Sequence, residues 1–536
     1  MKTLLKLSKL VASLFPVMAL AVVFGTAGFF CAIGIPVLGT ASLFFDFPVK
    51  FLILIGVLRG VLHYLEQYCN HFIAFTLLAR IRNIVFAKLR ELGPARIETK
   101  EKGNLISLIT SDIELLEVFY AHTISPVCIA VLVSAGMCVF LLHFSWILAL
   151  VALLFYVIIG ALIPAFVAKK SAAAGNEHRN QFAKMNSFLL DCLRGISMSI
   201  MYGTGSEKLA EIKMKSDELS KSQRKMAANE GVTSAVSGLF VTAGAVAMLF
   251  VSLVLFKTGK IEFSAVVVST AAMVSSFGPV IAIANLGSGL SQTVAAGKRV
   301  LDLLDEKPVV EEITSGKNVE FAGAEVKNVT FSYKKENILE DFSAKFPKGK
   351  IIGIKGKSGS GKSTLLKLLM RFWEVGAGEV LVSGENVKKI NTKSLRKIES
   401  YVTQETVLFH DTIAANIKIA RLDATDEEIV AACKKANVHD FIESLPQKYE
   451  TQVSELGDNF SGGERQRFGL ARAFLHGGNF VLLDEPTSNL DSYNERAIME
   501  TVKKEFAGKT VVIVSHRDST FEAADEVIRI GNGRKS

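Results

Sequence analysis

A run without any charged residue extends from Leu10 to Phe45. It is longer than the roughly 20 residues that a helix needs to cross the hydrocarbon core of a bilayer. We therefore predict a spanning helix plus its exit turn, with Pro36 as its natural stop. The basic flank of Lys2, Lys6 and Lys9 would also suit a signal peptide, but the apolar part of a signal peptide is only about 7–15 residues long, so an uncleaved anchor is the better interpretation.

Five further hydrophobic stretches follow this run. The first starts near Pro48 and becomes amphipathic after Arg59, whereas the other four contain no charge. These four are Thr123–Leu142, Ser145–Ala168, Gly231–Phe256 and Phe263–Leu286. We predict six membrane spans.

The net charge of +9, from 61 Lys and Arg against 52 Asp and Glu, admits either a nucleic-acid partner or a membrane protein with basic cytoplasmic loops. Many basic residues lie in the two long connections between spans, at 80–90 and 169–225, and by the positive-inside rule both connections face the cytoplasm. No basic stripe alternates with aromatic residues, so we predict a lipid bilayer and no nucleic acid as the partner. The six cysteines form no CxxC pair, which disfavours a zinc framework or a disulfide-stapled scaffold.

The second half of the chain has a different composition. Short β-branched runs at Ile351–Ile354, Val481–Leu483 and Val511–Val514 are separated by longer amphipathic stretches, which is typical of an α/β domain with a mostly parallel sheet. We predict a membrane domain at 1–300, a linker at 301–320 and an α/β domain at 321–536. Ligands of such sheets bind at the carboxyl ends of the strands, so the residues after each run are the candidates for function.

A glycine-rich loop follows the first run. It reads Gly356, Lys357, Ser358, Gly359, Ser360, Gly361, Lys362, Ser363 and Thr364, and a helical pattern comes next. Glycines allow consecutive backbone N–H groups and the helix N-terminus to point at phosphate oxygens. Lys362 supplies a positive charge for the outer phosphates, and Ser363 offers a hydroxyl to Mg²⁺. We therefore predict a nucleotide-phosphate site.

Acidic residues and a histidine follow the other two runs. Asp484 comes directly after Val481–Leu483 and is placed to hold Mg²⁺, while the adjacent Glu485 can polarise an attacking water. His516 comes after Val511–Val514, where an imidazole could reach the terminal phosphate. An acidic strand end or a lone histidine is more often structural, and it is the phosphate loop beside them that favours a catalytic reading.

The run Ser461-Gly462-Gly463-Glu464-Arg465-Gln466, before Asp484, resembles the signature loop of ABC transporter ATPases. From about Phe321 onward the chain follows that family in order. The resemblance implies that Tyr333 stacks on adenine, that Gln404 senses Mg²⁺ and the membrane half, and that Glu485 is the catalytic base. It further implies that Asp491 lies in the D-loop, that His516 is the switch histidine, and that ATP and Mg²⁺ are the cofactors.

The chain departs from the family pattern at a few positions of these motifs. Phe460 stands where Leu is usual, Ser454 where Gly is usual, Glu464 where Gln is common and Asn489 where Ala is common. None of these changes removes a catalytic group. We therefore predict an active ATPase.

Six spans ahead of one nucleotide domain resemble the exporter type of ABC half-transporter. In that family Ser461, Gly462 and Gly463 cap the ATP held by the partner's phosphate loop, which implies a dimer with a second half-transporter, either identical or related. The family also has a coupling helix in each long cytoplasmic loop, and we place these near Ser111–Phe119 and Met201–Glu207. The implied mechanism is alternating access.

The predicted second span carries polar residues on one helical face, among them Arg59, His63 and Glu66. If Lys50 lies at the outer surface, the rise of 1.5 Å per residue places Arg59 near the middle of the membrane, where an ionisable group is costly. One interpretation is a substrate path, in which Arg59 meets a carboxylate of the cargo. The other is a structural ion pair between Arg59 and an acid on a neighbouring helix.

The stretch from Arg59 to Pro126 looks like the half-transporters of cytochrome bd assembly, which export cysteine and glutathione and act as heterodimers. The resemblance rests on His63-Tyr64-Leu65-Glu66, Leu78-Ala79-Arg80-Ile81-Arg82, Leu92-Gly93-Pro94-Ala95-Arg96 and the Thr110-Ser111-Asp112 region. It implies a small polar solute, an amino acid or a thiol, exported across a bacterial plasma membrane. The alternative is a multidrug or lipid exporter, and a non-transport ABC ATPase is disfavoured by the six spans.

Overall fold

The computed structural model describes residues 12–46, 48–100, 102–333, 336–488 and 492–531. The chain divides into two compact units, a helical unit of residues 1–88 and 100–306 and an α/β unit of residues 89–99 and 307–536. The α/β unit thus begins inside the predicted 301–320 linker and also takes residues 89–99. The domain boundaries derived from the sequence remain a prediction. Composition alone does not show that a short segment such as 89–99 packs with another unit.

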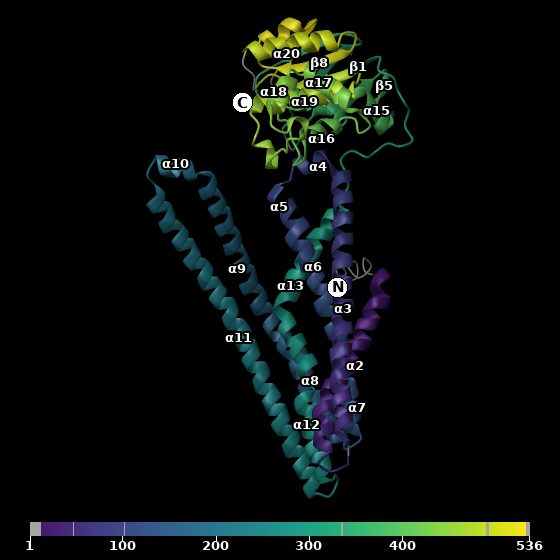
Figure 1. Cartoon of the computed structure of the whole chain (residues 1–536), viewed down its shortest axis with the longest axis vertical. Coiled ribbons are helices and arrows are strands. Elements are labelled where there is room, and N and C mark those ends of the chain that lie inside the picture. The colour runs from purple at the N-terminus through teal and green to yellow at the C-terminus, as the bar shows by residue number, and fades with distance from the viewer. Residues whose placement is uncertain (1–11, 47, 101, 334–335, 489–491, 532–536) are drawn as a thin grey trace. The chain divides into compact units, whose positions relative to one another are not determined.

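The helical unit consists of long helices joined by short turns (Figure 1). Turns of π-helix at Leu108–Asp112, Tyr120–Ile124 and Ile158–Leu162 connect some of them. The helices are α2 (Phe15–Ala41), α3 (Val49–Leu92), α5 (Lys102–Ser107), α6 (Ile113–Phe119), α7 (Ser125–Leu142), α8 (Trp146–Val157), α9 (Ile163–Arg194), α10 (Ile196–Met201), α11 (Gly205–Lys257), α12 (Phe263–Ser275) and α13 (Gly278–Asp305).

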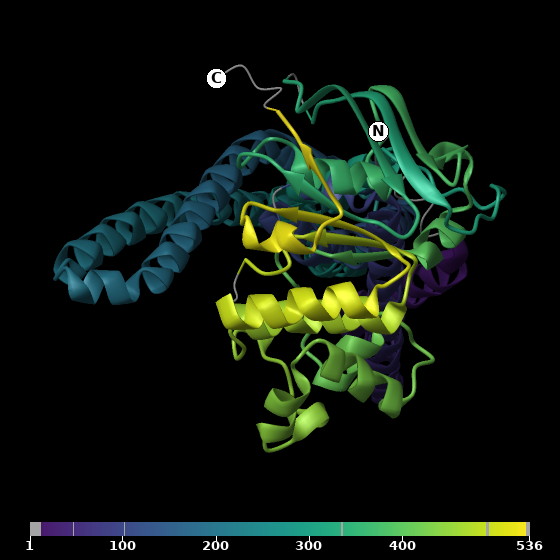
Figure 2. The ribbon, with the colours of Figure 1, turned by 90° about the horizontal axis from the view of Figure 1, so that it is seen from above.

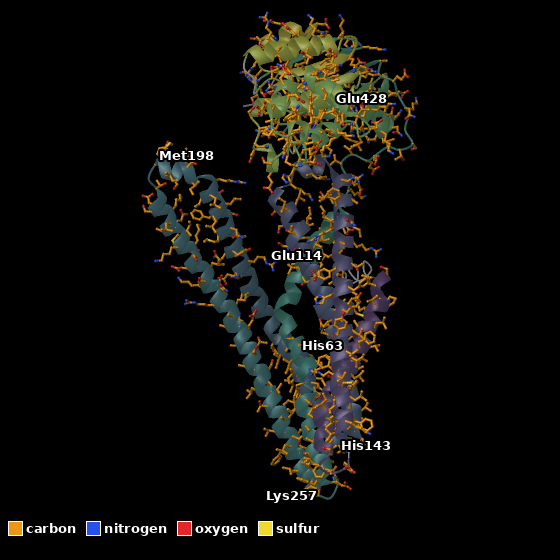
Figure 3. All side chains as sticks on the ribbon, viewed as in Figure 1. His63, Glu114, His143, Met198, Lys257 and Glu428 are labelled. Atoms are coloured by element: carbon orange, nitrogen blue, oxygen red, sulfur yellow. The ribbon has the colours of Figure 1, made fainter. Side chains whose placement is uncertain are left out.

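Within the described residues, five helical stretches are long and apolar enough to cross a membrane. They are Phe15–Ala41, Ser125–Leu142, Trp146–Phe166, Gly205–Lys257 and Phe263–Ala284, which match five of the six predicted spans. The remaining predicted span lies in α3, a continuous helix that is less apolar because it carries groups such as Arg59 and Glu66. His143 and Lys257 mark one end of this unit and Met198 the other (Figure 3).

The expectation that Pro36 stops the first span is wrong, since α2 runs through Pro36 to Ala41. Proline removes one N–H from a helix but leaves the other backbone groups able to bond. In an apolar environment those groups have no water to turn to, which favours continuing the helix. The Thr40 hydroxyl also donates to the Pro36 carbonyl at 2.9 Å, which supports the turn after the proline.

The core of the helical unit lies between α2, α7, α8, α11, α12 and α13. The Tyr156 hydroxyl bonds the Ser276 hydroxyl inside it, and the Tyr156 ring packs edge-on against Phe277. Nearer the long loops, Arg299 of α13 holds the buried Asp112 with two hydrogen bonds, Nε to Oδ2 at 2.7 Å and Nη2 to Oδ1 at 2.5 Å. This two-point contact fixes α13 against the segment that leads into α6.

The two predicted coupling helices need different corrections. The second was placed near Met201–Glu207, but the short helix of that loop is α10, which spans Ile196–Met201 and forms the tip between α9 and α11 (Figure 1). Gly205 to Glu207 already belong to α11. The first, placed near Ser111–Phe119, lies instead inside a continuous helical run. A separate short helix of that loop is α4 (Ala95–Glu98), which follows a break at Gly93-Pro94 and belongs to the α/β unit.

In the α/β unit, α4 packs against the part of the unit that begins at residue 307. Ala95 is buried in the core of this unit. The Glu98 carboxylate lies 2.9 Å from the Lys367 amine of α14 (Lys362–Leu369), the helix that follows the phosphate loop. The α4 segment is therefore tied directly to the helix that begins at Lys362.

Two sheets form the α/β unit (Figure 2). One is a four-stranded antiparallel sheet in the order β2-β1-β4-β5, and the other a five-stranded parallel sheet in the order β6-β7-β8-β3-β9. The strands are β1 (Gly323–Phe331), β2 (Leu339–Pro347), β3 (Ile351–Lys355), β4 (Ala377–Val382), β5 (Glu385–Asn386), β6 (Glu399–Val402), β7 (Phe480–Asp484), β8 (Thr510–Ser515) and β9 (Glu526–Arg529).

The three predicted β-branched runs are the strands β3, β7 and β8, at the centre of the parallel sheet. All residues of β7 and β8 are buried, as expected for parallel strands covered on both faces. The helices of the unit are α14, α15 (Thr392–Ile398), α16 (Ile413–Lys418), α17 (Asp426–Lys435), α18 (His439–Ser444), α19 (Gly462–His476) and α20 (Ser492–Glu505). The predicted α/β architecture with a parallel sheet is confirmed.

Glu399, the first residue of β6, is a buried acid in this core. Its side chain is 1% exposed, and the Arg396 Nη1 lies 2.7 Å from its Oε2. Its Oε1 has no hydrogen-bond partner among the described residues. Burial raises the pKa of Glu399 to about 7, although the charge of Arg396 acts in the opposite direction.

This raised pKa predicts a pH dependence of stability. Between the ordinary pKa of 4.5 and about 7 the folded state binds more protons than the unfolded state, so stability falls as the pH rises through this window. Glu399→Gln should remove that fall, which amounts to at most about 3 kcal/mol, and should leave the variant more stable than wild type at pH 8. Urea unfolding of the full-length protein from pH 5 to 8 measures this, with the exposed Glu450→Gln as control. An unchanged slope in the Glu399 variant would contradict the prediction.

Candidate functional site

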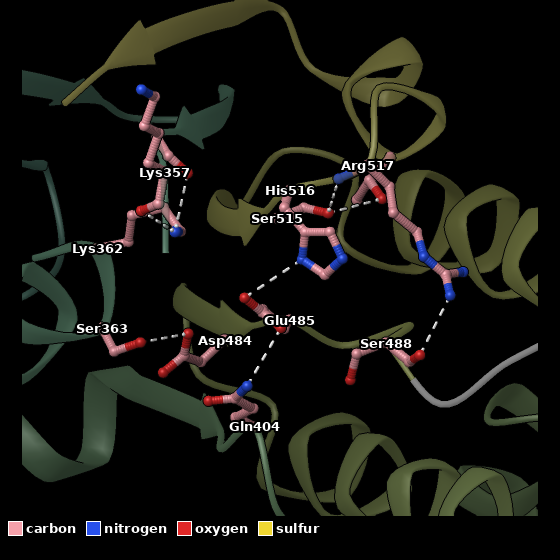
Figure 4. Close-up of polar contacts among 12 residues, drawn as sticks. Lys357, Lys362, Ser363, Gln404, Asp484, Glu485, Ser488, Ser515, His516 and Arg517 are labelled. Atoms are coloured by element: carbon pink, nitrogen blue, oxygen red, sulfur yellow. Dashed lines mark hydrogen bonds and ion pairs between the residues drawn. The ribbon is translucent and has the colours of Figure 1, made fainter. Parts of the chain in front are cut away.

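The strand order of the parallel sheet brings four polar segments to one edge. β6, β7, β8 and β3 are neighbours and run parallel, so their carboxyl ends meet. Gln404 follows β6, Glu485 follows β7, His516 follows β8 and the loop that begins at Gly356 follows β3. Residues far apart in sequence therefore lie together in one site (Figure 4).

The loop after β3 is shaped for close contact with a ligand. Gly361 has φ +96°, and a Cβ there would lie 2.9 Å from Ile338. A Cβ on Gly356 would lie 2.5 Å from the Ser360 Oγ. Glycine is therefore required at Gly356 and Gly361. The Lys362 amine donates to the Gly356 and Lys357 carbonyls at 3.0 and 3.1 Å, which holds it over the loop.

This loop fits a nucleotide phosphate. The Ser360 Oγ is buried and has no hydrogen-bond partner among the described residues, so a polar atom in the loop is available to a ligand. α14 begins at Lys362, directly after the loop, and its first N–H groups have no partner within the helix. A helix N-terminus preceded by such a loop favours bound anions.

Beside this loop lies the carboxylate of Asp484. The Ser363 Oγ donates to its Oδ1 at 2.9 Å, and the Tyr401 hydroxyl lies 3.5 Å from its Oδ2. Burial raises the pKa of Asp484, and the neighbouring charge of Glu485 acts in the same direction, while the hydrogen bond from Ser363 lowers it. A hydroxyl next to a carboxylate is the donor set that Mg²⁺ takes beside a nucleotide, and Ser363 and Asp484 would hold it.

Glu485 lies between two of the predicted residues (Figure 4). The Gln404 Nε2 donates to its Oε2 at 3.2 Å, and the His516 Nδ1 lies 3.4 Å from its Oε1. The structure thus brings Gln404, Glu485 and His516 together. The two flanking groups hold the carboxylate by both oxygens.

The structure also places here residues for which the sequence analysis predicted no role. Arg517 donates to the Ser488 carbonyl at 3.1 Å and pairs with the buried Glu495 at 2.6 Å. The Gln466 Nε2 donates to the backbone oxygen of Glu485 at 2.5 Å. Arg517 follows His516 directly and Gln466 lies in the signature run, so their positions in or beside the motifs are the sequence features that could have indicated a role in the site. Glu495 carries no such signal.

The remaining residues of the predicted ATP site lie as follows. The Tyr333 ring packs edge-on against Trp373, and its hydroxyl lies 3.2 Å from the Thr364 Oγ1. Ser461 is the N-cap of α19, which begins with Gly462 and Gly463. Asn489 and Asp491 lie outside the described residues.

Three of the departures from the family pattern have local partners. Glu464 completes a capping box with Ser461, in which its Oε2 accepts from the Ser461 N–H at 2.7 Å. The Ser454 hydroxyl donates to the Asn459 side chain at 2.9 Å. Phe460 is buried between Phe441 and Phe468. These substitutions are compatible with the site.

The candidate substrate-path residues lie in the helical unit, in α3. Glu66 is buried and its Oε2 lies 3.2 Å from the Nδ1 of the exposed His63. Arg59 is exposed, and in the described part of the chain it makes no ion pair. Among the described residues, the structural pair between Arg59 and an acid on a neighbouring helix is therefore not formed.

Comparison with known proteins agrees with this geometry. Residues 339–488 match the model of the ABC transporter family, and residues 45–280 match that of the ABC transporter transmembrane region. A probable ABC transporter ATP-binding/permease protein of Haemophilus influenzae is 45% identical over 99% of this chain and 98% of its own length.

The chain belongs to the ABC transporter family.

Other relatives of this ABC transporter have more specific names. An ATP-dependent lipid A-core flippase of Haemophilus influenzae is 30% identical over 89% of this chain and 82% of its own length. The solved structure of a bacterial Atm1-family ABC exporter with ATP bound has a TM-score of 0.81 at 22% identity, and covers 98% of this chain and 94% of that chain. This likeness shows a shared fold. The chain is an ABC exporter half-transporter with a transmembrane domain fused to an ATPase domain.

If Glu485 is the catalytic base, Glu485→Gln should keep ATP binding and lower ATP turnover by roughly a hundredfold or more, because an amide cannot accept the proton of the attacking water. Phosphate release by the purified dimer and binding of a fluorescent ATP analogue measure the two effects. Glu500→Gln, at an exposed position of α20, is the matched control. Turnover equal to wild type in the Glu485 variant would contradict the assignment.

Proposed function

We propose that this ABC transporter exports a small polar solute, an amino acid or a thiol such as cysteine or glutathione, from the bacterial cytoplasm by alternating access. The observation that carries the proposal is the exposed polar face of α3, with Arg59 and His63. A bacterial plasma membrane is supported by the bacterial relatives, and the ATPase domain then lies in the cytoplasm, where ATP is present.

The position of Arg59 supports a polar pathway. Arg59 lies ten residues after Val49, the first residue of α3, so it lies about 15 Å along the helix, near the centre of a core about 30 Å thick. A cation at that depth is costly in lipid and normally faces a protein interior or a water-filled cavity. Since Arg59 is exposed in one chain, a cavity between two half-transporters gives it such an environment. There it would meet the carboxylate of a solute.

His63 and Glu66 lie about one and two turns beyond Arg59 along α3. Glu66 is buried and pairs with His63, so its charge is held by the protein and does not face a ligand directly. His63 is exposed on the same side as Arg59. We assign Arg59 and His63 to solute contact and Glu66 to the orientation of His63.

The tip of the α9–α11 hairpin supports a dimer. Ile196, Met198, Ile200 and Met201 of α10 are each more than half exposed, so this cytoplasmic tip is apolar and uncovered in the single chain. The α/β unit exposes Val407 and Phe409 in the loop that follows Gln404. We propose that α10 packs on this loop of a second half-transporter, identical or related, so that motion of the membrane helices reaches Gln404.

In the ATP site, bound Mg²⁺ would neutralise phosphate charge, held by Ser363, Asp484 and Gln404. Lys362 and the loop N–H groups bind the phosphates, Tyr333 contacts the adenine, and Ser461, Gly462, Gly463 and Asp491 complete the site of the partner. Glu485 accepts the proton of the attacking water, and His516 holds Glu485 in place. ATP binding closes the two ATPase domains, and hydrolysis separates them again.

A lipid exporter is the second candidate. It is favoured by the relatives named lipid A-core flippase and by an apolar groove of about 680 Å³ in the helical unit, lined by Leu150, Leu153 and Trp146 of α8 and by residues of α7. ATPase activity in reconstituted vesicles discriminates the two. Stimulation by glutathione or cysteine, with uptake of labelled solute into inside-out vesicles, supports the first proposal. Stimulation by lipid A and none by the solutes supports the second.

Arg59→Ala tests the pathway. It should lower solute uptake at least tenfold, because the carboxylate of the solute loses its charge partner in a low-dielectric site, and should leave basal ATPase activity within about twofold. Lys50→Ala, at the outer end of the same helix, is the control. Normal uptake with normal assembly of the Arg59 variant would contradict a role in the pathway.

Ile200→Asp tests the contact of α10 with a second chain. A charge in this apolar contact should abolish transport while nucleotide binding remains, because burying an unpaired carboxylate is costly. Uptake and nucleotide affinity are measured on the same preparation, with the exposed Leu209→Asp on α11 as control. Full transport by the Ile200 variant would show that α10 does not dock on a partner.

A further inference from the structure

The backbone of Glu485 has a conformation that L residues rarely adopt. Its φ is +50°, in the left-handed region. Such a conformation persists only where surrounding contacts impose it, and it is often found where a side chain must be aimed. The contacts that impose it on Glu485 therefore decide where its carboxylate points.

Both backbone groups of Glu485 are held. Its N–H donates to the Val514 carbonyl of β8 at 2.9 Å. Its carbonyl accepts from the Gln466 Nε2 at 2.5 Å and from the Ser488 N–H at 3.2 Å. The hydrogen bond from Ser488 comes from three residues farther along the chain, whereas Val514 lies in β8 and Gln466 in α19. Of these three hydrogen bonds, the one from Gln466 is made by a side chain.

Gln466 is suited to a fixed contact. It is 2% exposed, so its amide has no competing solvent, and its Nε2 also lies 3.4 Å from the Ser488 Oγ. It belongs to α19, whose start is anchored by the capping box at Ser461 and by Arg465, which donates to the Gly457 and Phe460 carbonyls at 3.1 and 2.9 Å. A rigid helix thus presents the amide to Glu485.

We propose that Gln466 is a positioning residue, which ties the strained backbone of Glu485 to the signature helix α19 and so aims the carboxylate at the attacking water. The inference rests on the proposed role of Glu485 as base. It adds a link within one chain between Ser461, which faces the nucleotide of the partner, and Glu485, which acts on its own nucleotide. A shift of α19 when the partner's nucleotide binds then moves the backbone of the base directly.

Gln466→Met tests the proposal, because methionine keeps the length and burial of the side chain and removes the N–H donor. We expect kcat for ATP to fall roughly tenfold to a hundredfold with KM within about twofold, since misplacing a reacting group lowers the rate without weakening nucleotide binding. The full-length dimer is used, with Gln447→Met at an exposed position as control. Equal kcat in the Gln466 variant and wild type would overturn the proposal.

A second measurement separates positioning from a general structural role. The double variant Glu485→Gln/Gln466→Met should still form the closed, ATP-bound dimer. Its thermal unfolding temperature should match that of the double variant Glu485→Gln/Gln447→Met. Loss of closure or of stability would show that Gln466 supports α19 itself and would overturn the positioning role. If Glu485→Gln alone retains full turnover, the base assignment fails. If Glu485→Gln is inactive and Gln466→Met is normal, only the present inference fails.

Discussion

The order of the parallel strands β6-β7-β8-β3 is the constraint on which the ATP site depends. Each strand ends at the same edge of the sheet and delivers the residue or loop that follows it, Gln404, Glu485, His516 and the loop at Gly356. A one-residue slip in register would turn the following side chain to the other face of the sheet. The burial of β7 and β8 on both faces resists such a slip, because any shift would displace a fully packed apolar strand.

The parts of this site that could be predicted are those encoded by short contiguous stretches. β3, β7 and β8 are apolar and β-branched because both faces are buried, and the residues after them follow from chain continuity. Gln466 and Arg517 donate to the backbone carbonyls of Glu485 and Ser488. Because every residue has a backbone carbonyl, such a contact does not require a particular residue type at the accepting position. Only the folded chain shows such contacts.

In the helical unit, hydropathy and helix breakers were informative to different degrees. Uncharged runs correctly indicated the apolar helices, but Pro36 did not end α2, because a helix in lipid keeps its remaining backbone hydrogen bonds. In the first long loop, Gly93-Pro94 follows the end of α3 and precedes α4, whereas the resemblance to the exporter family suggested a short helix near 111–119. The reduced hydropathy of α3 stems from groups such as Arg59, which is exposed in the single chain.

α11 is one uninterrupted helix of 53 residues, from the tip at α10 to the opposite end of the helical unit. At 1.5 Å per residue it is about 80 Å long, and no proline interrupts it. A stiff rod of this length amplifies rotation, since a tilt of about 10° at one end displaces the other end by roughly 14 Å. Small rearrangements among packed membrane helices would therefore produce large displacements at α10, without any flexible joint along the helix.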